Sequence, residues 1–382
     1  MVIFRNNMKR SLQIMNTMKP LFKSALILLS LFILSCENYS KQPLITYDPL
    51  APNFIYDGRI DTLADNSIGL IGSASSVKFN VSGDSLILMI QSQYAQGNNF
   101  ALVINSELQK RYMIRDSLIN RYTIHLPSKG KNKIGIYKTS EAATGNLIFH
   151  GIEAKSILVA PERHKKTIEF IGNSITCGAL SDTAEVSCGE GFYHDQHNAY
   201  LAYGPRLARA LKVNYFVSAV SGIGIYRNWN DENELEPNML QVYENLYLDL
   251  NSPKPYPFKV KPDIVSICLG TNDMSDGDGS KERKEFNKDR FIENYIVLID
   301  KIYKHYPKCQ IVLLNSPMLS ADKNETLFAC LETVKEHFGD SHQIELFSFE
   351  GIFPNGCFWH PSIQDHDKMA NQLLPFFKKF MK

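Results

Sequence analysis

The chain has 382 residues, which is longer than one ordinary domain and sufficient for two. Lys and Arg together number 41 and Asp and Glu 40, with no basic stripe, so the charge pattern argues against a nucleic-acid-binding function. Hydrophobic residues make up 44% and charged residues 21% of the chain, which is typical of a globular protein and excludes a disordered one.

The first 36 residues are typical of an export signal. Basic residues precede an apolar run from Ala25 to Leu34, which is too short to cross a bilayer and suits the core of a signal peptide. The run ends in Leu34-Ser35-Cys36, which resembles a bacterial lipobox and implies cleavage before Cys36 and attachment of diacylglycerol to its thiol. We therefore expect a signal peptide with lipobox over residues 1–36 and a bacterial cell-envelope protein, exported and lipid-anchored through Cys36, in the periplasm or on the outer surface. The alternatives are an uncleaved anchor and a plain signal peptide with a chance cysteine.

Residues 45–160 show the pattern of an all-β domain. Short runs of alternating apolar and polar residues are separated by Gly, Asn, Asp and Ser, without a sustained helical apolar stripe. Several short strands at this spacing predict a β-sandwich. The predicted strands are Ser76–Val81, Ser85–Gln91, Phe100–Asn105, Arg121–Leu126 and Lys133–Lys138, with a turn at Ser82-Gly83-Asp84 between the first two.

Residues 167–382 follow a polar linker and show strands alternating with helices. This alternation predicts a parallel sheet with helices on both faces, in which ligands bind beyond the carboxyl ends of the strands. The predicted strands are Thr167–Ile171, Val213–Val217, Asp263–Leu269, Gln310–Asn315 and Gln343–Ser348. The predicted helices are Ala199–Leu211, Asp289–His305, Glu325–Phe338 and Asp365–Met381.

Four residues suited to acyl transfer follow the predicted strands of this second domain. Ser174 follows the first strand, where a sharp turn into a helix would expose a nucleophile. Gly222 and Asn272 follow the second and third strands, and each can donate an N–H to a developing oxyanion. His360 lies before a proline after the last strand and can act as a general base. Taken singly, each also has a structural interpretation: a helix cap, a turn glycine, an Asx turn and a structural histidine.

Together and in this order, the four blocks resemble the SGNH (GDSL) hydrolase superfamily over Thr167 to the C-terminus. The resemblance implies a three-layer α/β/α, flavodoxin-like fold and a serine esterase. It assigns Ser174 as the nucleophile and His360 as the base, with Gly222, Asn272 and the Ser174 amide as oxyanion donors. This mechanism needs neither a metal nor a cofactor, and the acidic stretch after Asn272 does not fit a calcium loop.

Finer detail resembles carbohydrate esterase family 2. The segments that carry it are Gly172–Gly178, Asn198–Gly204 and Asp57–Asp61. The resemblance implies a jelly-roll domain before the SGNH domain and removal of O-acetyl groups from xylan- or glucomannan-type polysaccharides. We therefore expect an acetylated polysaccharide or oligosaccharide as partner. An SGNH esterase acting on another ester (a lipid, a thioester or a sialate acetyl group) and a catalytically silent carbohydrate-binding lipoprotein remain alternatives.

The sequence departs from the SGNH pattern three residues before the histidine, where Cys357 replaces the usual Asp. In carbohydrate esterase family 2 a backbone carbonyl beside the histidine can replace that acid, and the resemblance assigns this role to the carbonyl of Trp359. A neutral acceptor fixes the histidine tautomer but stabilises the imidazolium less than a carboxylate does. The indole of Trp359 is also a candidate face for a sugar ring, with core packing as the alternative.

Six cysteines follow Cys36, and an exported protein meets oxidising conditions in which disulfides form. Their connectivity does not follow from the sequence. Cys177 and Cys188 flank one loop beside Ser174, so that pair is the first candidate, whereas Cys268 lies in an apolar strand and is expected to be a buried thiol.

Overall fold

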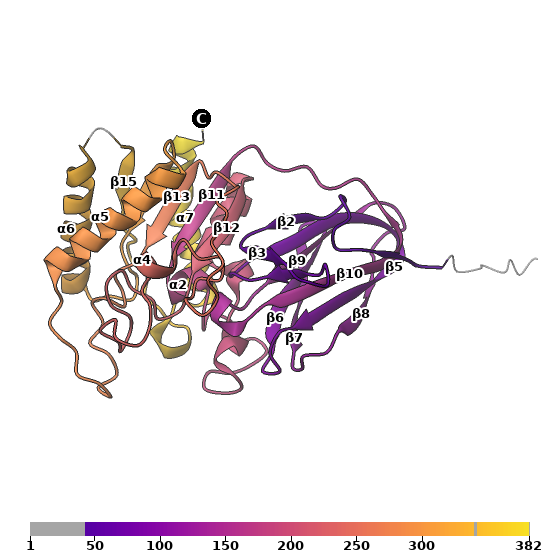
Figure 1. The fold of residues 1–382 in the computed structure, drawn as a ribbon, viewed down its shortest axis with the longest axis horizontal. Coiled ribbons are helices and arrows are strands. Elements are labelled where there is room, and N and C mark those ends of the chain that lie inside the picture. Colours follow the sequence, from indigo (N-terminus) through magenta and orange to yellow (C-terminus); the bar gives the residue numbers. More distant parts are fainter. Residues whose placement is uncertain (1–42, 340–341, 382) are drawn as a thin grey trace, which may run out of the picture. The chain divides into compact units, whose positions relative to one another are not determined.

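The computed structural model describes residues 43–339 and 342–381. Within Leu44–Lys382, an antiparallel β domain is followed by a parallel α/β domain (Figure 1). The predicted signal peptide, lipobox and Cys36 lie outside the described residues. Among the residues described, none of the helices has the length and apolar character needed to span a bilayer.

The N-terminal domain is one sheet of ten antiparallel strands around an apolar core. Seven strands form the path β3-β4-β10-β5-β9-β6-β7, while β1 pairs with β10, and β2 and β8 pair with β5. The strands are β1 Ile45–Tyr47, β2 Ile55–Asp57, β3 Ile60–Thr62, β4 Ile68–Leu70, β5 Ser76–Ser92, β6 Asn98–Ile104, β7 Glu107–Ile114, β8 Asn120–His125, β9 Asn132–Lys138 and β10 Leu147–Ile157.

The predicted turn at Ser82-Gly83-Asp84 is wrong. Strand β5 runs through it as a single element of 17 residues. The strand continues because its backbone stays hydrogen-bonded there: Gly83 N–H donates to the Lys129 carbonyl, and Leu126 N–H donates to the Asp84 carbonyl. At this point β5 changes partner, from β9 along its first part to β8 along its second. Glycine and aspartate therefore mark a change of partner within one long strand.

The C-terminal domain is a five-stranded, wholly parallel sheet in the order β12-β11-β13-β14-β15. In chain order this is 2-1-3-4-5, the flavodoxin-like arrangement, with its switch point beside β11. The strands are β11 Thr167–Gly172, β12 Asn214–Ala219, β13 Ile264–Cys268, β14 Gln310–Leu314 and β15 Ile344–Phe347. The predicted α/β fold class is confirmed.

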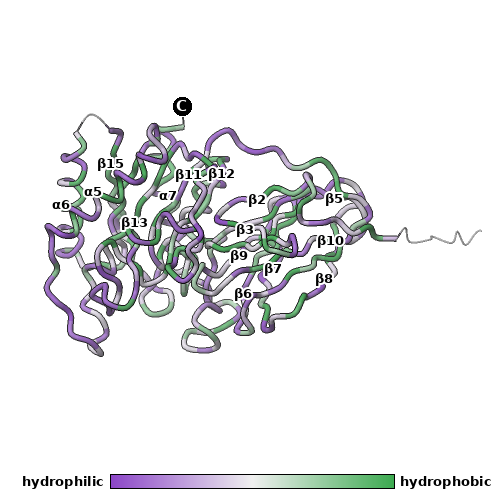
Figure 2. The backbone as a smooth tube through the Cα atoms, viewed as in Figure 1, coloured by the Kyte–Doolittle hydropathy of each residue, from purple (hydrophilic) through white to green (hydrophobic). Residues whose placement is uncertain are grey.

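Helices cover both faces of this sheet (Figure 1). One face packs against α5 and α6, and the other against α3 and α7. Hydrophilic and hydrophobic residues alternate along α5 and α6 (Figure 2), as expected for helices with one buried face. The α-helices are α2 Ser174–Cys177, α3 Tyr203–Leu211, α4 Met239–Val242, α5 Lys288–His305, α6 Ala321–Phe338 and α7 Ile363–Phe377. The short 3₁₀ helices are η1 Ala142–Thr144, η2 Tyr193–Gln196, η3 Ala199–Leu201, η5 Cys357–Trp359 and η6 Lys378–Phe380.

The two sheets are joined by a buried arginine. Arg59, from the β domain, is fully buried and donates to Ser218 Oγ on β12 and to the carbonyls of Tyr243 and Asn245. Burying a charge in this way is costly unless its donors are satisfied, so the contact fixes the β domain against the α/β domain. Because Leu44–Lys382 folds as one compact unit, the boundaries 45–160 and 167–382 stay a prediction.

Candidate active site

Ser174 lies where β11 turns into α2. Asn173 caps this helix, because its side-chain oxygen accepts the N–H of Ile175 at 3.0 Å, so Ser174 is the first helical residue and not the cap. The turn is tight at Gly172, where a Cβ would lie 2.0 Å from Thr176 Oγ1 and 3.0 Å from the Cys268 carbonyl oxygen. Glycine therefore lets the strand turn directly into the helix.

His360 lies against Ser174. Its Nε2 is 2.9 Å from Ser174 Oγ, and its Nδ1 is 3.2 Å from the carbonyl oxygen of Phe358. A carbonyl can only accept, so Nδ1 carries the proton and Nε2 presents a lone pair. The Ser174 hydroxyl then donates to Nε2, which is the arrangement that a general base needs before it takes the serine proton.

The carbonyl that orients His360 belongs to Phe358. The prediction that Trp359 supplies this carbonyl is wrong. Phe358 and Trp359 both have left-handed backbone, with φ of 51° and 64°. Two such residues in succession turn the chain back and bring the carbonyl two residues before the histidine to its ring. The sequence identified the kind of group correctly, but it missed this turn because neither residue is a glycine or an asparagine.

Gly222 and Asn272 come from the loops after β12 and β13, the two strands that flank β11. Asn272 Nδ2 donates to the carbonyl of Ile223 at 2.8 Å, so its side chain reaches the Gly222 loop. An amide carries two N–H donors, and this bond uses one of them, which leaves the other for a ligand. Gly222 has φ of 76°, a left-handed conformation that favours glycine.

Two family descriptions match the chain. Residues 170–369 match the GDSL-like lipase/acylhydrolase family, and residues 56–161 match the N-terminal domain of carbohydrate esterase 2. The chain belongs to the GDSL-like lipase/acylhydrolase family. It combines that hydrolase domain with the N-terminal domain of carbohydrate esterase 2.

Similar proteins share both parts. An acetylxylan esterase/glucomannan deacetylase from Cellvibrio japonicus is 30% identical over 262 residues, which cover 66% of this chain and 71% of that protein. A family two carbohydrate esterase from Clostridium thermocellum, solved in complex with cellohexaose, is 27% identical with a TM-score of 0.75, covering 86% of this chain and 99% of that one. A family two carbohydrate esterase from Cellvibrio japonicus superposes with a TM-score of 0.77 over 88% of this chain and 98% of that one; at 22% identity it shows the fold alone.

Asp273 braces the Gly222 loop in this GDSL-like hydrolase. Its buried carboxylate accepts the backbone N–H groups of Ile225, Tyr226 and Arg227 at 2.9–3.3 Å. It directly follows Asn272, so this carboxylate and the Asn272 amide both join the loop after β13 to the loop after β12. The two loops that carry the predicted oxyanion donors are therefore held together.

The disulfide in this hydrolase links Cys188 to Cys357. The suggested pairing of Cys177 with Cys188 is wrong, because Cys177 is a buried free thiol on α2, as Cys268 is on β13. Cys357 directly precedes the Phe358 carbonyl that orients His360. The bond therefore ties the histidine turn to the loop after Ser174 at the position where the family usually has Asp.

We expect the double variant Cys188→Ser/Cys357→Ser to lose about 2–5 kcal/mol of unfolding free energy, as is typical of native disulfides. Its kcat should fall more than its KM rises, since the Phe358 carbonyl loses its covalent support. Thermal unfolding and p-nitrophenyl acetate kinetics measure both effects. Cys309→Ala, which removes a free buried thiol, is the control. An unchanged kcat would show that the disulfide does not position the histidine.

The pKa of His360 is lowered from its ordinary value of 6.5, mainly by burial, and the hydrogen bond to the Phe358 carbonyl opposes the shift. Only the neutral imidazole can accept the serine proton, and a lowered pKa keeps it neutral to lower pH. We therefore expect the acid limb of the kcat/KM profile for p-nitrophenyl acetate to have its midpoint below pH 6.5. A midpoint above pH 6.5 would contradict a buried base.

Proposed function

We propose that the protein is a serine esterase that removes O-acetyl groups from a polysaccharide of the xylan or glucomannan type. The observation that carries the proposal is the contact of Ser174 Oγ with His360 Nε2 at 2.9 Å, with the tautomer fixed by the Phe358 carbonyl. The similar proteins named acetylxylan esterase/glucomannan deacetylase support the acetyl group as the part removed.

The proposed mechanism assigns one role to each of these residues. His360 takes the Ser174 proton while Oγ attacks the acetyl carbonyl, and the oxyanion lies among the Ser174 N–H, the Gly222 N–H and the Asn272 amide. His360 then protonates the departing sugar alcohol, and the acetyl group stays on Ser174. A water molecule, deprotonated by His360, attacks the acetyl-enzyme and releases acetate.

Exposed aromatic side chains beside the dyad support a sugar-chain substrate. Trp359 is 81% exposed and Phe358 is 66% exposed, and these are the two residues before His360. Two neighbouring exposed aromatic rings beside a catalytic residue offer an apolar face on which a sugar ring can stack. The similar esterase that was solved in complex with cellohexaose also supports a sugar chain as the ligand. We propose that the indole of Trp359 stacks on a sugar ring next to the acetylated one.

The decisive experiment measures acetate release from acetylated xylan, acetylated glucomannan and p-nitrophenyl acetate by protein that begins after Cys36. Release from a polysaccharide supports the proposal and ranks the two substrates. Activity on the small ester alone points to another natural ester, such as a lipid, a thioester or a sialate acetyl group. Binding to polysaccharide without any acetate release points to a catalytically silent carbohydrate-binding protein.

Trp359→Ala tests the sugar platform in the same assay. We expect KM for the better polysaccharide to rise about tenfold, in line with the loss of roughly 1.4 kcal/mol of binding, while kcat/KM for p-nitrophenyl acetate changes little. A parallel loss on both substrates would show that Trp359 supports the histidine turn and does not contact sugar.

We also propose that the protein is exported and held on a membrane by a lipid on Cys36. The basic and apolar residues before Cys36, followed by a polar tether, support this proposal. In a bacterial host, Cys36→Ser should move the protein from the membrane fraction to the soluble exported fraction. Mass spectrometry of the wild-type N-terminus should show diacylglycerol. A wild-type N-terminus without acyl chains would contradict the lipid anchor and favour a plain signal peptide.

A further inference from the structure

A buried carboxylate from the β domain reaches the candidate active site. Glu141 lies between β9 and η1, and its side chain is almost completely buried. It is not among the residues predicted from the sequence. Buried glutamates are rare unless their oxygens accept hydrogen bonds or form ion pairs. The partners of this carboxylate therefore indicate its role.

The partners of Glu141 belong to the segments around the dyad. Oε2 accepts the backbone N–H of Ser221 at 2.6 Å, and Oε1 lies 3.3 Å from His197 Nε2. Ser221 directly precedes Gly222, so the carboxylate fixes the peptide just before the Gly222 N–H. Cys177, at the end of the helix that begins with Ser174, lies 3.5 Å from Oε2. One carboxylate thus contacts the nucleophile helix and the oxyanion loop.

His197 takes part as a donor. The backbone N–H of Leu180 donates to His197 Nδ1 at 3.3 Å, so Nδ1 has no proton and Nε2–H faces Glu141. Leu180 in turn accepts the N–H of Cys357 at 3.0 Å. A chain of bonds therefore runs from Glu141 through His197 and Leu180 to the turn that carries His360.

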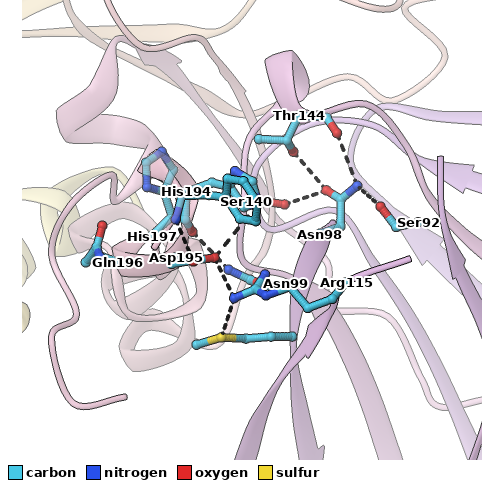
Figure 3. Close-up of polar contacts among 12 residues, drawn as sticks. Ser92, Asn98, Asn99, Arg115, Ser140, Thr144, His194, Asp195, Gln196 and His197 are labelled. Carbon is cyan, nitrogen blue, oxygen red and sulfur yellow. Dashed lines mark hydrogen bonds and ion pairs between the residues drawn. The ribbon is translucent and has the colours of Figure 1, made fainter. Parts of the chain in front are cut away.

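The β domain bonds the segments on both sides of this contact. Figure 3 shows the bonds around Ser140 and Thr144 and those around His194 and Asp195. On the Glu141 side, Asn98 Oδ1 accepts the hydroxyls of Ser140 at 2.6 Å and Thr144 at 2.8 Å, which flank Glu141 in the chain.

On the His197 side, Arg115 pairs with Asp195 at 2.8 Å, and Asn99 donates to the His194 carbonyl at 2.9 Å. These bonds come from strand β6 and from the residue that follows β7. The segments that carry Glu141 and His197 are therefore both bonded to the strands of the β domain.

The charge state suits this role. Burial would raise the pKa of Glu141, but the hydrogen bonds from His197 and Ser221 outweigh it, and the pKa lies below its ordinary value. Glu141 is therefore a carboxylate at neutral pH, and its bond to the Ser221 N–H is charge-assisted. Such bonds are stronger than those between neutral groups.

We propose that Glu141 is a positioning residue for ester hydrolysis, through which the β domain holds the Val220–Ser221 peptide, next to the Gly222 N–H, and the His360 turn in their catalytic arrangement. The inference rests on the proposed esterase function and deepens it. If Glu141 has this role, the β domain contributes a positioning residue to the active site. A merely structural carboxylate would support folding without affecting the transition state.

The test compares Glu141→Gln with Glu169→Gln, since Glu169 is also a buried glutamate and accepts hydrogen bonds from Ser218 Oγ and Tyr243 OH. Glutamine has the same size as glutamate, but only one of its two terminal atoms can accept a hydrogen bond. We expect Glu141→Gln to lower kcat for p-nitrophenyl acetate at least tenfold with KM within threefold of wild type. Glu169→Gln should lower the melting temperature without lowering the kcat of the folded protein.

A second readout reports on the oxyanion site itself. Phenylboronic acid forms a tetrahedral adduct on a serine nucleophile, so its inhibition constant should rise in Glu141→Gln in step with the fall in kcat. Equal kcat and inhibition constants in Glu141→Gln and Glu169→Gln would overturn the inference. A wild-type protein inactive on every ester would instead sink the proposed function, so the two failures are distinguishable.

Discussion

Ser174→Ala and His360→Ala are each expected to lower kcat for p-nitrophenyl acetate by about 10⁴-fold. In subtilisin, removing the catalytic serine or the catalytic histidine lowers kcat by about 10⁶-fold, and removing the aspartate lowers it by about 10⁴-fold. In this protein the Phe358 carbonyl takes the place of that aspartate beside His360. We therefore expect the wild-type kcat to be lower than that of an enzyme with a full triad. The loss should therefore be smaller than in a full triad.

The double variant Ser174→Ala/His360→Ala should be no worse than either single variant. Nucleophile and base act as one unit, so removing the second partner takes away nothing further. Steady-state kinetics of the three variants, with melting temperatures, measure this. Ser266→Ala, which removes a buried hydroxyl from β13, is the matched control and should keep full activity. Additive losses would show that Ser174 and His360 act independently.

The architecture could be predicted because periodicity is local. Strand and helix patterns over residues 167–382 predicted the parallel sheet, and the position of Ser174 after the first strand followed from the same pattern. The segment Ser82-Gly83-Asp84 within β5 was wrongly predicted as a turn, because Ser-Gly-Asp is a turn signal whose outcome depends on its neighbours. There, pairing with β8, β9 and β10 outweighed the local preference.

The finer parts of the site depend on tertiary contacts that leave no local pattern. The Cys188–Cys357 bond joins residues 169 positions apart, so spacing favoured the nearer but wrong partner for Cys188. Glu141 lies 80 residues from Ser221, and the two residues follow strands of different sheets. The one available signal was a charged residue after the mostly apolar strand β9, and a solvated loop would have looked the same.

Asn272→Ala is expected to lower kcat by about 10²- to 10³-fold with little change in KM, because one lost oxyanion donor costs about 3–4 kcal/mol of transition-state stabilisation. The ground-state ester carries little charge on its oxygen, so the amide contributes mainly after attack. Asn272→Asp should lose at least as much as alanine, since a carboxylate of the same size repels the oxyanion. Kinetics on p-nitrophenyl acetate measure both variants.

The contact between Asn272 and the Gly222 loop needs its own control, because the side chain also donates to Ile223. Asp273→Asn weakens the same loop through the N–H groups of Ile225, Tyr226 and Arg227 without removing an oxyanion donor. It should lower the melting temperature more than Asn272→Ala does, and kcat less. If both variants lost kcat equally, Asn272 would act by holding the loop, and the oxyanion would be stabilised by the backbone of Ser174 and Gly222 alone.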